Sequence, residues 1–415
     1  MDPSTRIVIT GLGALTPVGN NIPEMWAALS AGSSGITRIT QFDPQGFDTQ
    51  IAGEVKGFDP QALFGLKEAR RLDRATQFAA VAARQAMADA GLESLAPHSD
   101  RAAVIIGSGI GGPWTIYSEV RRFVERGPHA VSPFFIPMAI PDSPAAQVAI
   151  ETGARGINLA VSSACATGTN AVGEGAWLIR RGEADIVLAG GAEAGVVPVV
   201  MAGFGNMKTL STHNDDPPSA CRPFDATRDG FVMGEGAGVL VLERYEHARA
   251  RGARIYAELL GYGSTVDATH WAAPLEGGHG LARAIQLALE RAGLAAEQVD
   301  YINAHGTGTR LNDRIETQSI KAVFRESAYR TPISSTKSMT GHMMGAAGAV
   351  EAIICVKALE TGCLPPTINY RVPDPECDLD YLPNQARRSP ITVALSNSLG
   401  MGGHNAALVF RKVEQ

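Results

Sequence analysis

The residues of this chain best suited to chemistry are one cysteine, two histidines and one lysine, each close to glycine. Cys165 stands in Val161-Ser-Ser-Ala-Cys-Ala-Thr-Gly-Thr-Asn170, which is typical of a strand end followed by a helix. The first turn of a helix has unpaired N–H groups and partial positive charge, so it can lower a thiol pKa below about 8.5. This position predicts a nucleophile, although a lone cysteine is more commonly a small buried hydrophobe.

Two histidines further along the chain support the interpretation of Cys165 as a nucleophile. His305 ends the apolar strand in Val299-Asp-Tyr-Ile-Asn-Ala-His-Gly-Thr-Gly-Thr309, and His342 follows Lys337 in Ser334-Ser-Thr-Lys-Ser-Met-Thr-Gly-His-Met-Met-Gly345. Strand ends of α/β proteins commonly carry active-site side chains. A single histidine would more commonly be structural. Reactive side chains occur at three separate strand-to-helix junctions: Cys165 at the first, His305 at the second, and Lys337 with His342 at the third. Packing alone does not easily explain this pattern, so it predicts one catalytic site.

The elements that must position these residues alternate along the chain. Runs of Val, Ile and Leu, typical of strands buried on both faces, predict strands at 6–10, 102–107, 157–162, 186–190, 238–243, 255–261, 301–303, 332–335, 391–396 and 406–410. Helical periodicity predicts helices at 23–31, 67–90, 167–181, 280–292, 313–324 and 346–360. The alternation indicates an α/β layered fold, and the charged connection 243–254 predicts a boundary near Arg251.

Composition narrows the class of protein. The 415 residues are 45% hydrophobic, enough for a large core, and the net charge of −6 gives no general affinity for nucleic acid. No CxxC pair occurs among the five cysteines, which argues against a zinc site or a disulfide framework and suits a reducing compartment. We find no signal peptide, and Glu193 and glycines interrupt the longest apolar tract, 186–204. We expect a cytoplasmic protein, or one matured in an organelle, without membrane contact.

These segments resemble the β-ketoacyl-[acyl-carrier-protein] synthases, the condensing enzymes of fatty-acid and polyketide synthesis, and most closely the elongating synthase II type. The resemblance extends over nearly the whole chain, through Val8-Ile-Thr-Gly-Leu-Gly13, Gly107-Ser-Gly-Ile-Gly-Gly112, Ser132-Pro-Phe-Phe135, Ala189-Gly-Gly-Ala-Glu193, Arg222-Pro-Phe-Asp225, Asp229-Gly-Phe-Val-Met-Gly-Glu-Gly236 and Gly402-Gly-His-Asn405. It implies the thiolase fold, in which two similar halves form a five-layered αβαβα sandwich. Residues 1–251 would carry the nucleophile, and residues 252–415 the two catalytic histidines.

The resemblance also implies a reaction. Cys165 would hold an acyl group as a thioester, and decarboxylation of malonyl-acyl carrier protein would supply the carbanion for a Claisen condensation. His305 and His342 would donate hydrogen bonds to the enolate oxygen, and Lys337 would orient them. The backbone N–H groups of Cys165 and Met401 would form an oxyanion hole for the acyl thioester. No cofactor or metal is expected beyond the phosphopantetheine that the carrier protein brings.

The remaining implied positions surround this centre. Glu351 and Asp313 would be structural residues near the site, whereas the substrate contacts would be Ile110 and Phe204 in the acyl pocket and Thr307 and Thr309 on the phosphopantetheine arm. From the sequence pattern alone, Ile110 and Phe204 would more simply be core hydrophobes. Thr307 and Thr309 would be a strand cap and a turn residue.

A basic helical face is the candidate docking surface. Lys67, Arg70, Arg71 and Arg74 fall at i, i+3, i+4 and i+7, so one helix would present them together. Charges alone equally suit an ordinary solvated face. Acyl carrier proteins are acidic, so the resemblance favours docking, with Lys208 as a further contact.

Two loops depart from the family. The glycine-rich loop has Met401 where a phenylalanine gate is usual, and the facing loop reads His270-Trp-Ala-Ala273 where His-Met-Thr-Ser is usual. Methionine is flexible, and Trp271 adds apolar surface near the entrance. We expect the preference for acyl chains to shift towards unsaturated or rigid chains. The alternative is that methionine replaces phenylalanine at similar volume and leaves the substrate preference unchanged.

Other functions remain open at this stage. A degradative thiolase would carry a second cysteine near the C-terminus, where this chain has Met401 and His404. A non-catalytic chain-length subunit would lack Cys165. A catalytic subunit of a type II polyketide or polyene synthase, paired with a Cys-lacking chain-length partner, fits as well as a homodimeric fatty-acid enzyme.

Overall fold

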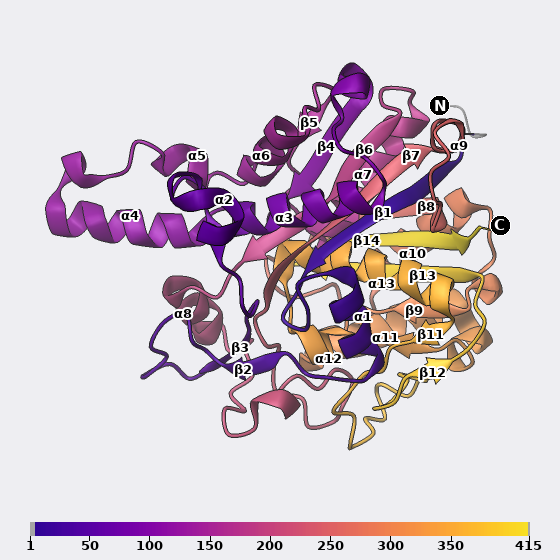
Figure 1. The fold of residues 1–415 in the computed structure, drawn as a ribbon. Coiled ribbons are helices and arrows are strands. Elements are labelled where there is room, and N and C mark those ends of the chain that lie inside the picture. Colours follow the sequence, from indigo (N-terminus) through magenta and orange to yellow (C-terminus); the bar gives the residue numbers. More distant parts are fainter. Residues whose placement is uncertain (1–4, 414–415) are drawn as a thin grey trace.

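Ten strands form one continuous sheet through the centre of the protein in the computed structural model, which describes residues 5–413 (Figure 1). In chain order they are β1 (Ile7–Leu15), β4 (Ala102–Gly107), β5 (Asn158–Leu159), β6 (Ile186–Ala194), β7 (Glu235–Arg244), β8 (Ala257–Val266), β9 (Tyr301–Asn303), β10 (Ile333–Ser334), β13 (Val393–Gly400) and β14 (His404–Lys412). Each matches a predicted strand. β1 extends beyond its prediction because the chain continues to pair with β7 as far as Leu15. Gly11 and Gly13 leave room for a helix to pack directly on it.

The two halves of the chain repeat one strand order. The sheet runs β5-β4-β6-β7-β1 in the first half and β10-β9-β13-β14-β8 in the second, so corresponding strands occupy corresponding places. In each half the two outermost pairs are parallel and the others antiparallel. The halves join where β1 pairs with β8, at Val8 with Glu258 and Ile9 with Ala257. The duplication, which inspection of the sequence does not show, is therefore present in the topology.

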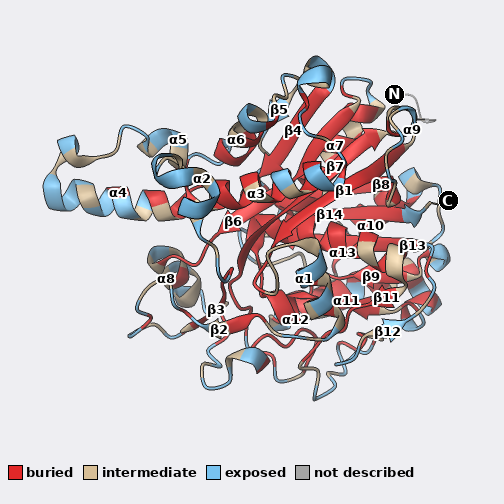
Figure 2. Cartoon of the chain, in the orientation of Figure 1, coloured by how far each residue is buried: buried red, intermediate tan, exposed pale blue. Residues whose placement is uncertain are grey.

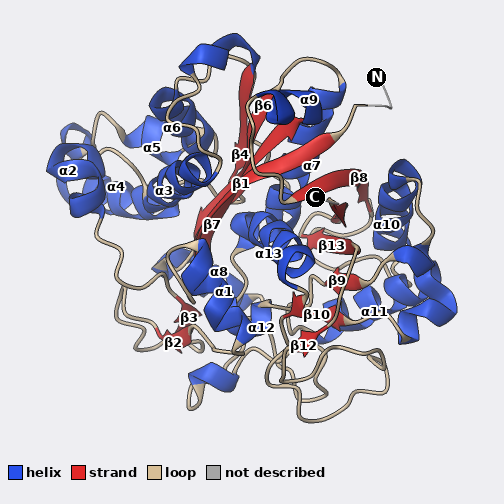
Figure 3. Cartoon of the chain, turned by 45° about the vertical axis from the view of Figure 1, so that its right-hand side comes forward, coloured by secondary structure: helices blue, strands red, loops and turns tan. Residues whose placement is uncertain are grey.

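Helices cover both faces of each half, which confirms the expected αβαβα sandwich (Figure 3). The central layer is α7 (Thr167–Arg180) with α13 (Ala347–Thr361), and the outer layers are α3 (Arg74–Asp89) with α6 (Ser143–Thr152), and α10 (His279–Ala292) with α11 (Arg310–Phe324). The strands and the central helices are largely buried (Figure 2).

The two central helices touch through a pair of glycines. A Cβ atom on Gly168 would lie 2.5 Å from the Ala349 nitrogen, and one on Gly348 would lie 2.1 Å from Thr169 Oγ1. Neither glycine has room for a side chain. This close contact brings the N-terminal ends of α7 and α13 together.

The prediction of one helix over 67–90 is wrong. The structure has α2 (Pro60–Ala69) and α3, separated by a turn. Gly65, with φ 74°, already interrupts α2, and the buried carboxylate of Asp73 caps α3 by accepting from the Ala75 N–H at 3.1 Å. The basic residues between 67 and 74 therefore do not share one helical face.

The other elements are short or lie at the periphery. α1 (Ile22–Ser30) was predicted; the sequence analysis did not find α4 (Pro113–Arg126), α5 (Phe135–Ala139), α8 (Pro198–Asn206), α9 (Tyr245–Ala250) and α12 (Lys337–Thr340), nor the small sheets β2 (Ile36–Arg38) with β3 (Ile51–Gly53) and β11 (Cys363–Leu364) with β12 (Arg387–Arg388). α4 projects from the body (Figure 1). Within residues 5–413, no helix is both long and apolar enough to span a bilayer. α9 lies in the connection between the halves, and the division at Arg251 stays a prediction.

Candidate active site

The structure brings the three predicted reactive side chains together from both halves. The Cys165 sulfur and one ring nitrogen each of His305 and His342 all lie within 4.8 Å of one another. Cys165 is in the turn before α7, His305 follows β9, and His342 precedes α13. The meeting point therefore lies at the ends of strands and at the start of the two central helices.

These side chains open onto a cavity of about 460 Å³. Of the residues implied by the resemblance, the cavity is lined by Cys165, His305, His342, Phe204, Lys208, Thr307, Thr309 and Met401. Ile110 does not line it. The Trp271 side chain, 87% exposed, also lies outside the lining, although its neighbours His270 and Ala272 contribute to it.

Cys165 sits in a tight turn of 3₁₀ helix, Ala164–Ala166. Ala164 has φ 50°, a left-handed conformation that costs energy for a residue with a side chain. Gly400 approaches the same turn so closely that a Cβ there would lie 2.7 Å from the Ser163 carbonyl oxygen. This packing directs the Met401 N–H at the thiol, where it can stabilise negative charge.

The expected lowering of the thiol pKa is not found. Burial raises the pKa of Cys165 to about 11, and the Met401 N–H and the Lys337 ammonium oppose this rise only in part. The sequence expectation failed because desolvation of the thiolate outweighs the effect of the helix N-terminus. The free enzyme therefore holds Cys165 as a thiol at neutral pH.

Both imidazoles are neutral. Burial, together with the nearby Lys337 ammonium, holds the pKa values of His305 and His342 well below their usual range. The two rings meet edge to face, with centroids 5.2 Å apart. A neutral imidazole keeps one N–H donor and one lone pair, so each ring can donate a hydrogen bond to a developing oxyanion.

The backbone on either side of each histidine is fixed. Glu316 accepts from the N–H groups of His305 at 2.6 Å and Gly306 at 2.7 Å. His342 donates its N–H to the Val232 carbonyl at 2.7 Å and accepts from the Gly234 N–H at 2.9 Å. Burial raises the pKa of Glu316 to about 7. Sequence analysis did not single out Glu316, which lies in α11 two turns beyond the His305 loop.

Lys337 forms a buried ion pair with Glu351 beneath the histidines. Burial raises the pKa of Glu351 to about 7, and Lys337 opposes that rise. Among the residues that the structure describes, one Glu351 oxygen has no hydrogen-bond partner. The ammonium thus lies close enough to act on the imidazoles and on the thiol by charge, while its own contact is with Glu351. That Lys337 orients the histidines stays a prediction.

Glu193 is a second carboxylate that the sequence analysis missed as a site residue. It accepts from Ser108 Oγ at 2.9 Å, the Gly109 N–H at 2.8 Å and the Gly345 N–H at 3.0 Å. Burial raises its pKa to about 7. Glu193 therefore ties the loop after β4 to the turn that precedes α13, next to His342.

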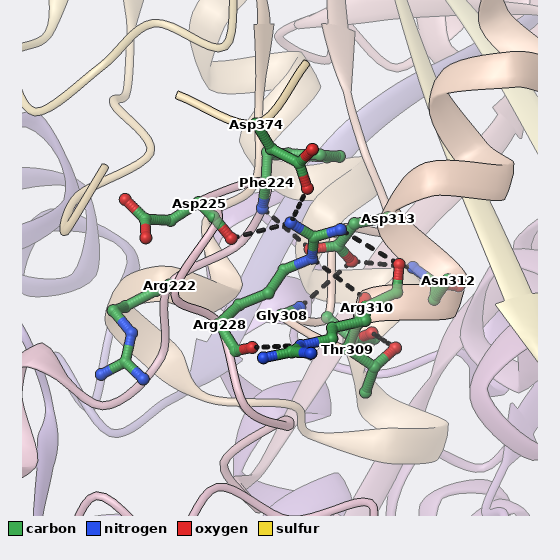
Figure 4. A network of polar contacts seen from close by, with 12 residues as sticks. Arg222, Phe224, Asp225, Arg228, Gly308, Thr309, Arg310, Asn312, Asp313 and Asp374 are labelled. Atoms are coloured by element: carbon green, nitrogen blue, oxygen red, sulfur yellow. Dashed lines mark hydrogen bonds and ion pairs between the residues drawn. The ribbon is translucent and has the colours of Figure 1, made fainter. Parts of the chain in front are cut away.

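The loop that carries Thr307 and Thr309 is held by Arg228 (Figure 4). This guanidinium lies 3.4 Å from Asp313 and 2.6 Å from Asp374, and donates to the Thr309 carbonyl at 3.3 Å. Asp313 in turn accepts from the Gly308 N–H at 3.2 Å. Asp313 thus contacts the loop and its arginine partner, and its structural role stays a prediction. Arg228 positions the loop, and nothing in the sequence around this single arginine indicated that role.

The candidate docking residues have different environments. Arg74 pairs with the buried Glu235 at 2.6 Å and is only 21% exposed, so it stabilises the fold and is no longer a docking candidate. The Arg71 guanidinium lies 4.6 Å above the Phe134 ring. Lys67 and Arg70 are exposed, and Lys208 pairs with Asp48 at 2.8 Å on the surface.

The two altered loops contact each other at the cavity. The Gly402 N–H donates to the Trp271 carbonyl at 2.7 Å, which joins the loop of Met401 to the loop of Trp271. His270 Nδ1 accepts from the N–H groups of Ala272 at 3.0 Å and Ala273 at 2.9 Å. A displacement of one loop is therefore transmitted to the other.

Comparison with known proteins agrees with this geometry. Residues 4–248 match the family "Beta-ketoacyl synthase, N-terminal domain", and residues 256–371 match "Beta-ketoacyl synthase, C-terminal domain". "3-oxoacyl-[acyl-carrier-protein] synthase 2" of Staphylococcus aureus (strain COL) is 50% identical over 414 residues, which cover 100% of each chain.

Two solved structures have the same fold. "The ishigamide ketosynthase/chain length factor" matches with a TM-score of 0.92 and 40% identity, over 99% of this chain and 100% of that one. AntDE:AntF, described as a "type II PKS acyl-carrier protein in complex with its ketosynthase bound to the hexaketide", matches with a TM-score of 0.92 and 38% identity over the same shares.

Fold and site together define a thiolase-fold acyltransferase with one cysteine and two histidines at its cavity. The chain belongs to the β-ketoacyl synthase family. It is a ketosynthase, as the resemblance predicted, and the degradative thiolase and the chain-length subunit without a nucleophile are set aside.

Proposed function

We propose that this ketosynthase elongates fatty acyl chains by decarboxylative Claisen condensation of an acyl group on Cys165 with malonyl-acyl carrier protein. The observation that carries the proposal is the convergence of the Cys165 thiol and two neutral imidazoles within 4.8 Å of one another on a single cavity. The higher identity to the named synthase 2, 50% against 40% and 38% for the two polyketide-type structures, supports fatty-acid elongation.

The first half-reaction transfers the acyl group. The Cys165 sulfur attacks the thioester carbonyl of the acyl carrier protein, the bond to the pantetheine sulfur breaks, and the thiol proton ends on the departing pantetheine thiol. The N–H groups of Cys165 and Met401 would hold the oxyanion. The backbone of both residues is positioned by the contact between Gly400 and the Ala164–Ala166 turn.

The second half-reaction forms the carbon–carbon bond. Malonyl thioester loses CO₂, and the negative charge moves to the thioester oxygen, where His305 and His342 would donate hydrogen bonds. The enolate carbon then attacks the acyl carbonyl, releases the β-ketoacyl thioester and leaves a Cys165 thiolate that takes a proton from solvent. Neutral imidazoles can fill this role because each ring keeps one N–H to donate.

Acyl carrier protein is the proposed partner. The exposed Lys67 and Arg70, with Arg71 and Lys208, would contact its acidic surface, and Thr307 and Thr309 at the cavity would contact the phosphopantetheine arm. The AntDE:AntF structure contains a ketosynthase with its carrier protein, which supports this assignment. Ile110 and Trp271 stay predictions, because neither side chain lines the cavity.

We also propose a homodimer. Val120, Phe123 and Val124 of α4 are exposed apolar residues, as is Leu159 on the edge strand β5, and a second copy could cover them. The alternative is a heterodimer with a chain-length factor in a polyketide or polyene pathway, as in the ishigamide structure. The proposed chemistry needs no cofactor, and the cytoplasmic location remains a prediction.

Reconstitution with purified acyl- and malonyl-acyl carrier protein tests the function. The full chain alone should gain the mass of one acyl group and release β-ketoacyl-acyl carrier protein. Cys363→Ala, which alters another buried cysteine, should do the same. If condensation occurs only after a paralogue without the cysteine is added, the polyketide alternative would be accepted in place of fatty-acid elongation.

A further inference from the structure

The active site contains buried polar atoms that no hydrogen bond satisfies. Within residues 5–413, His342 has both ring nitrogens buried without a partner, and His305 has its Nδ1 in the same state. Most buried polar side-chain atoms in proteins are hydrogen-bonded, so each exception calls for an explanation. The imidazole nitrogens lie beside the Cys165 sulfur, which is also buried and faces the Met401 N–H.

This set of donors matches one class of ligand. Cysteine sulfur and histidine nitrogen are the donors that Zn²⁺ prefers, and a site with three protein ligands leaves a fourth position open. We propose that Cys165, His305 and His342 bind one zinc ion, and that this ion competes with the acyl group for the Cys165 sulfur. The site is thus an inhibitory one built from catalytic residues.

The three donor atoms need to move only a little to coordinate one ion. The donor atoms lie within 4.8 Å of one another, whereas Zn–S and Zn–N bonds of about 2.3 and 2.0 Å place tetrahedral donors roughly 3.5 Å apart. Rotation of the thiol about its Cα–Cβ bond, with small ring movements, would supply the difference. The fourth position would face the cavity, from which water can reach it.

The surrounding charges permit a cation. The Lys337 ammonium would repel it, but Glu351 pairs with that ammonium and offsets its charge. The Glu193 carboxylate lies close enough to act on the thiol by charge. The Met344 thioether sulfur, 4.0 Å from the Cys165 sulfur, adds a soft and polarisable neighbour.

Binding would be a simple exchange of a proton for a metal. The Cys165 S–H bond breaks, the sulfur–zinc bond forms, the proton passes to buffer, and no atom is oxidised or reduced. A sulfur bound to zinc is a weaker nucleophile, because it shares its negative charge with the metal, and the ion occupies the space that a thioester must enter. The metal would therefore hinder acylation reversibly. Conversely, an acyl group on the sulfur would exclude the metal.

Co²⁺ titration of the purified full chain tests the site without measuring turnover. Co²⁺ takes the place of Zn²⁺ and gives a sulfur-to-metal charge-transfer band with the intense visible bands of tetrahedral coordination. We expect one equivalent to bind, and Zn²⁺ to abolish the spectrum by displacement. Cys363→Ala should keep the band, whereas Cys165→Ala should lose it.

The histidines are tested separately. His305→Ala and His342→Ala should each weaken Co²⁺ binding at least about tenfold, since loss of even an outer contact to a metal ligand costs that much. His305→Asn serves as a second variant if an alanine variant unfolds. Acylated enzyme should show no band.

A band that persists in Cys165→Ala, or an affinity unchanged by both histidine variants, would refute the zinc site. The band is independent of catalysis. Loss of condensation together with normal Co²⁺ binding would therefore reject the proposed function alone.

Discussion

The two halves of this ketosynthase use the same turn for different chemistry. In the first half, a 3₁₀ turn at Ala164–Ala166 precedes α7, and Ala164 has φ 50°. In the second half, a 3₁₀ turn at Met344–Ala346 precedes α13, and Met344 has φ 44°. The residue after the left-handed position is Cys165 in one half and Gly345 in the other.

This difference shows that the site is asymmetric in its side chains and symmetric in its backbone. The N-terminal ends of both helices lie together, so their partial positive charges act together on an anion formed beside them. At this turn the first half carries the proposed nucleophile, whereas the second half carries a glycine. The second half donates the Gly345 N–H to Glu193 at 3.0 Å and places His342 just before the turn.

The sharpest way to separate the two halves is to remove their side chains one at a time. Cys165→Ala should abolish acyl-enzyme formation entirely. His305→Ala and His342→Ala should leave self-acylation measurable but slow malonyl decarboxylation by about 10²–10³, the usual cost of a lost oxyanion donor. Intact-mass spectrometry follows the acylation, and CO₂ release follows decarboxylation. Normal condensation by either histidine variant would show that the second half has another role.

The pH dependence of alkylation tests which effect controls the first turn. With a pKa of about 11, the thiolate fraction of Cys165 rises with pH throughout the neutral and mildly alkaline range. The rate of modification by iodoacetamide should therefore rise about tenfold per pH unit between about pH 7 and 9. Mass spectrometry measures it, with Cys165→Ala as the background. A plateau below about pH 8.5 would mean that the N-terminus of α7 outweighs burial after all.

The contact between the central helices can be broken from either side. Gly168→Ala and Gly348→Ala should each lower the free energy of unfolding by about 1–3 kcal/mol, because the new Cβ overlaps the opposite helix. Denaturant unfolding measures the change. Gly203→Ala in α8 is the matched control, since a Cβ there meets nothing within 4 Å and alanine favours a helix. Equal stability of all three variants would mean that the central helices can separate at little cost.

The gate loop of the second half should set chain preference. Met401→Phe is expected to change the ratio of kcat/KM for saturated and polyunsaturated acyl carrier proteins several-fold, because a rigid ring replaces a side chain that can reshape. Profiles over both substrate series provide the comparison. Indistinguishable profiles would show that Met401 replaces phenylalanine by volume without changing chain preference. The condensing mechanism would be unaffected by that result.

Charge reversal on the exposed surface of the first half should have the smallest effect on the reaction. Lys67→Glu with Arg70→Glu should raise KM for acyl carrier protein substrates about two- to fivefold and weaken its salt dependence, since exposed charges act mainly on encounter. Small pantetheine thioesters should be unaffected. Arg74→Glu should differ, because it leaves the buried Glu235 unpaired and lowers stability with both substrates.

The sequence predicted the parts of the molecule that local patterns determine. The strands were found because they are continuous Val/Ile/Leu runs, and the meeting of Cys165, His305 and His342 followed from their places at strand ends. The fold class was available through the family resemblance. The repeated strand order could not be read, because the two halves share topology and not an evident repeat of residues.

What the sequence could not predict depends on burial and on distant contacts. The thiol pKa of Cys165 is controlled by desolvation, which appears only when the turn is packed. The break before α3 depends on Asp73 being buried as a cap, although the residues around it favour a helix. Glu193 and Arg228 act through partners far away in the chain, so no local spacing marks them.

The seam between β1 and β8 limits how this enzyme can adapt. Because two residue pairs there join the halves into one sheet, the halves cannot swing apart as hinged lobes to admit a larger substrate. Adaptability would then reside in the loops of Met401 and Trp271, which the hydrogen bond from the Gly402 N–H to the Trp271 carbonyl helps to couple. Grafting one of these loops from a relative without the other would break that coupling, so the pair is the unit to exchange when redesigning chain selectivity.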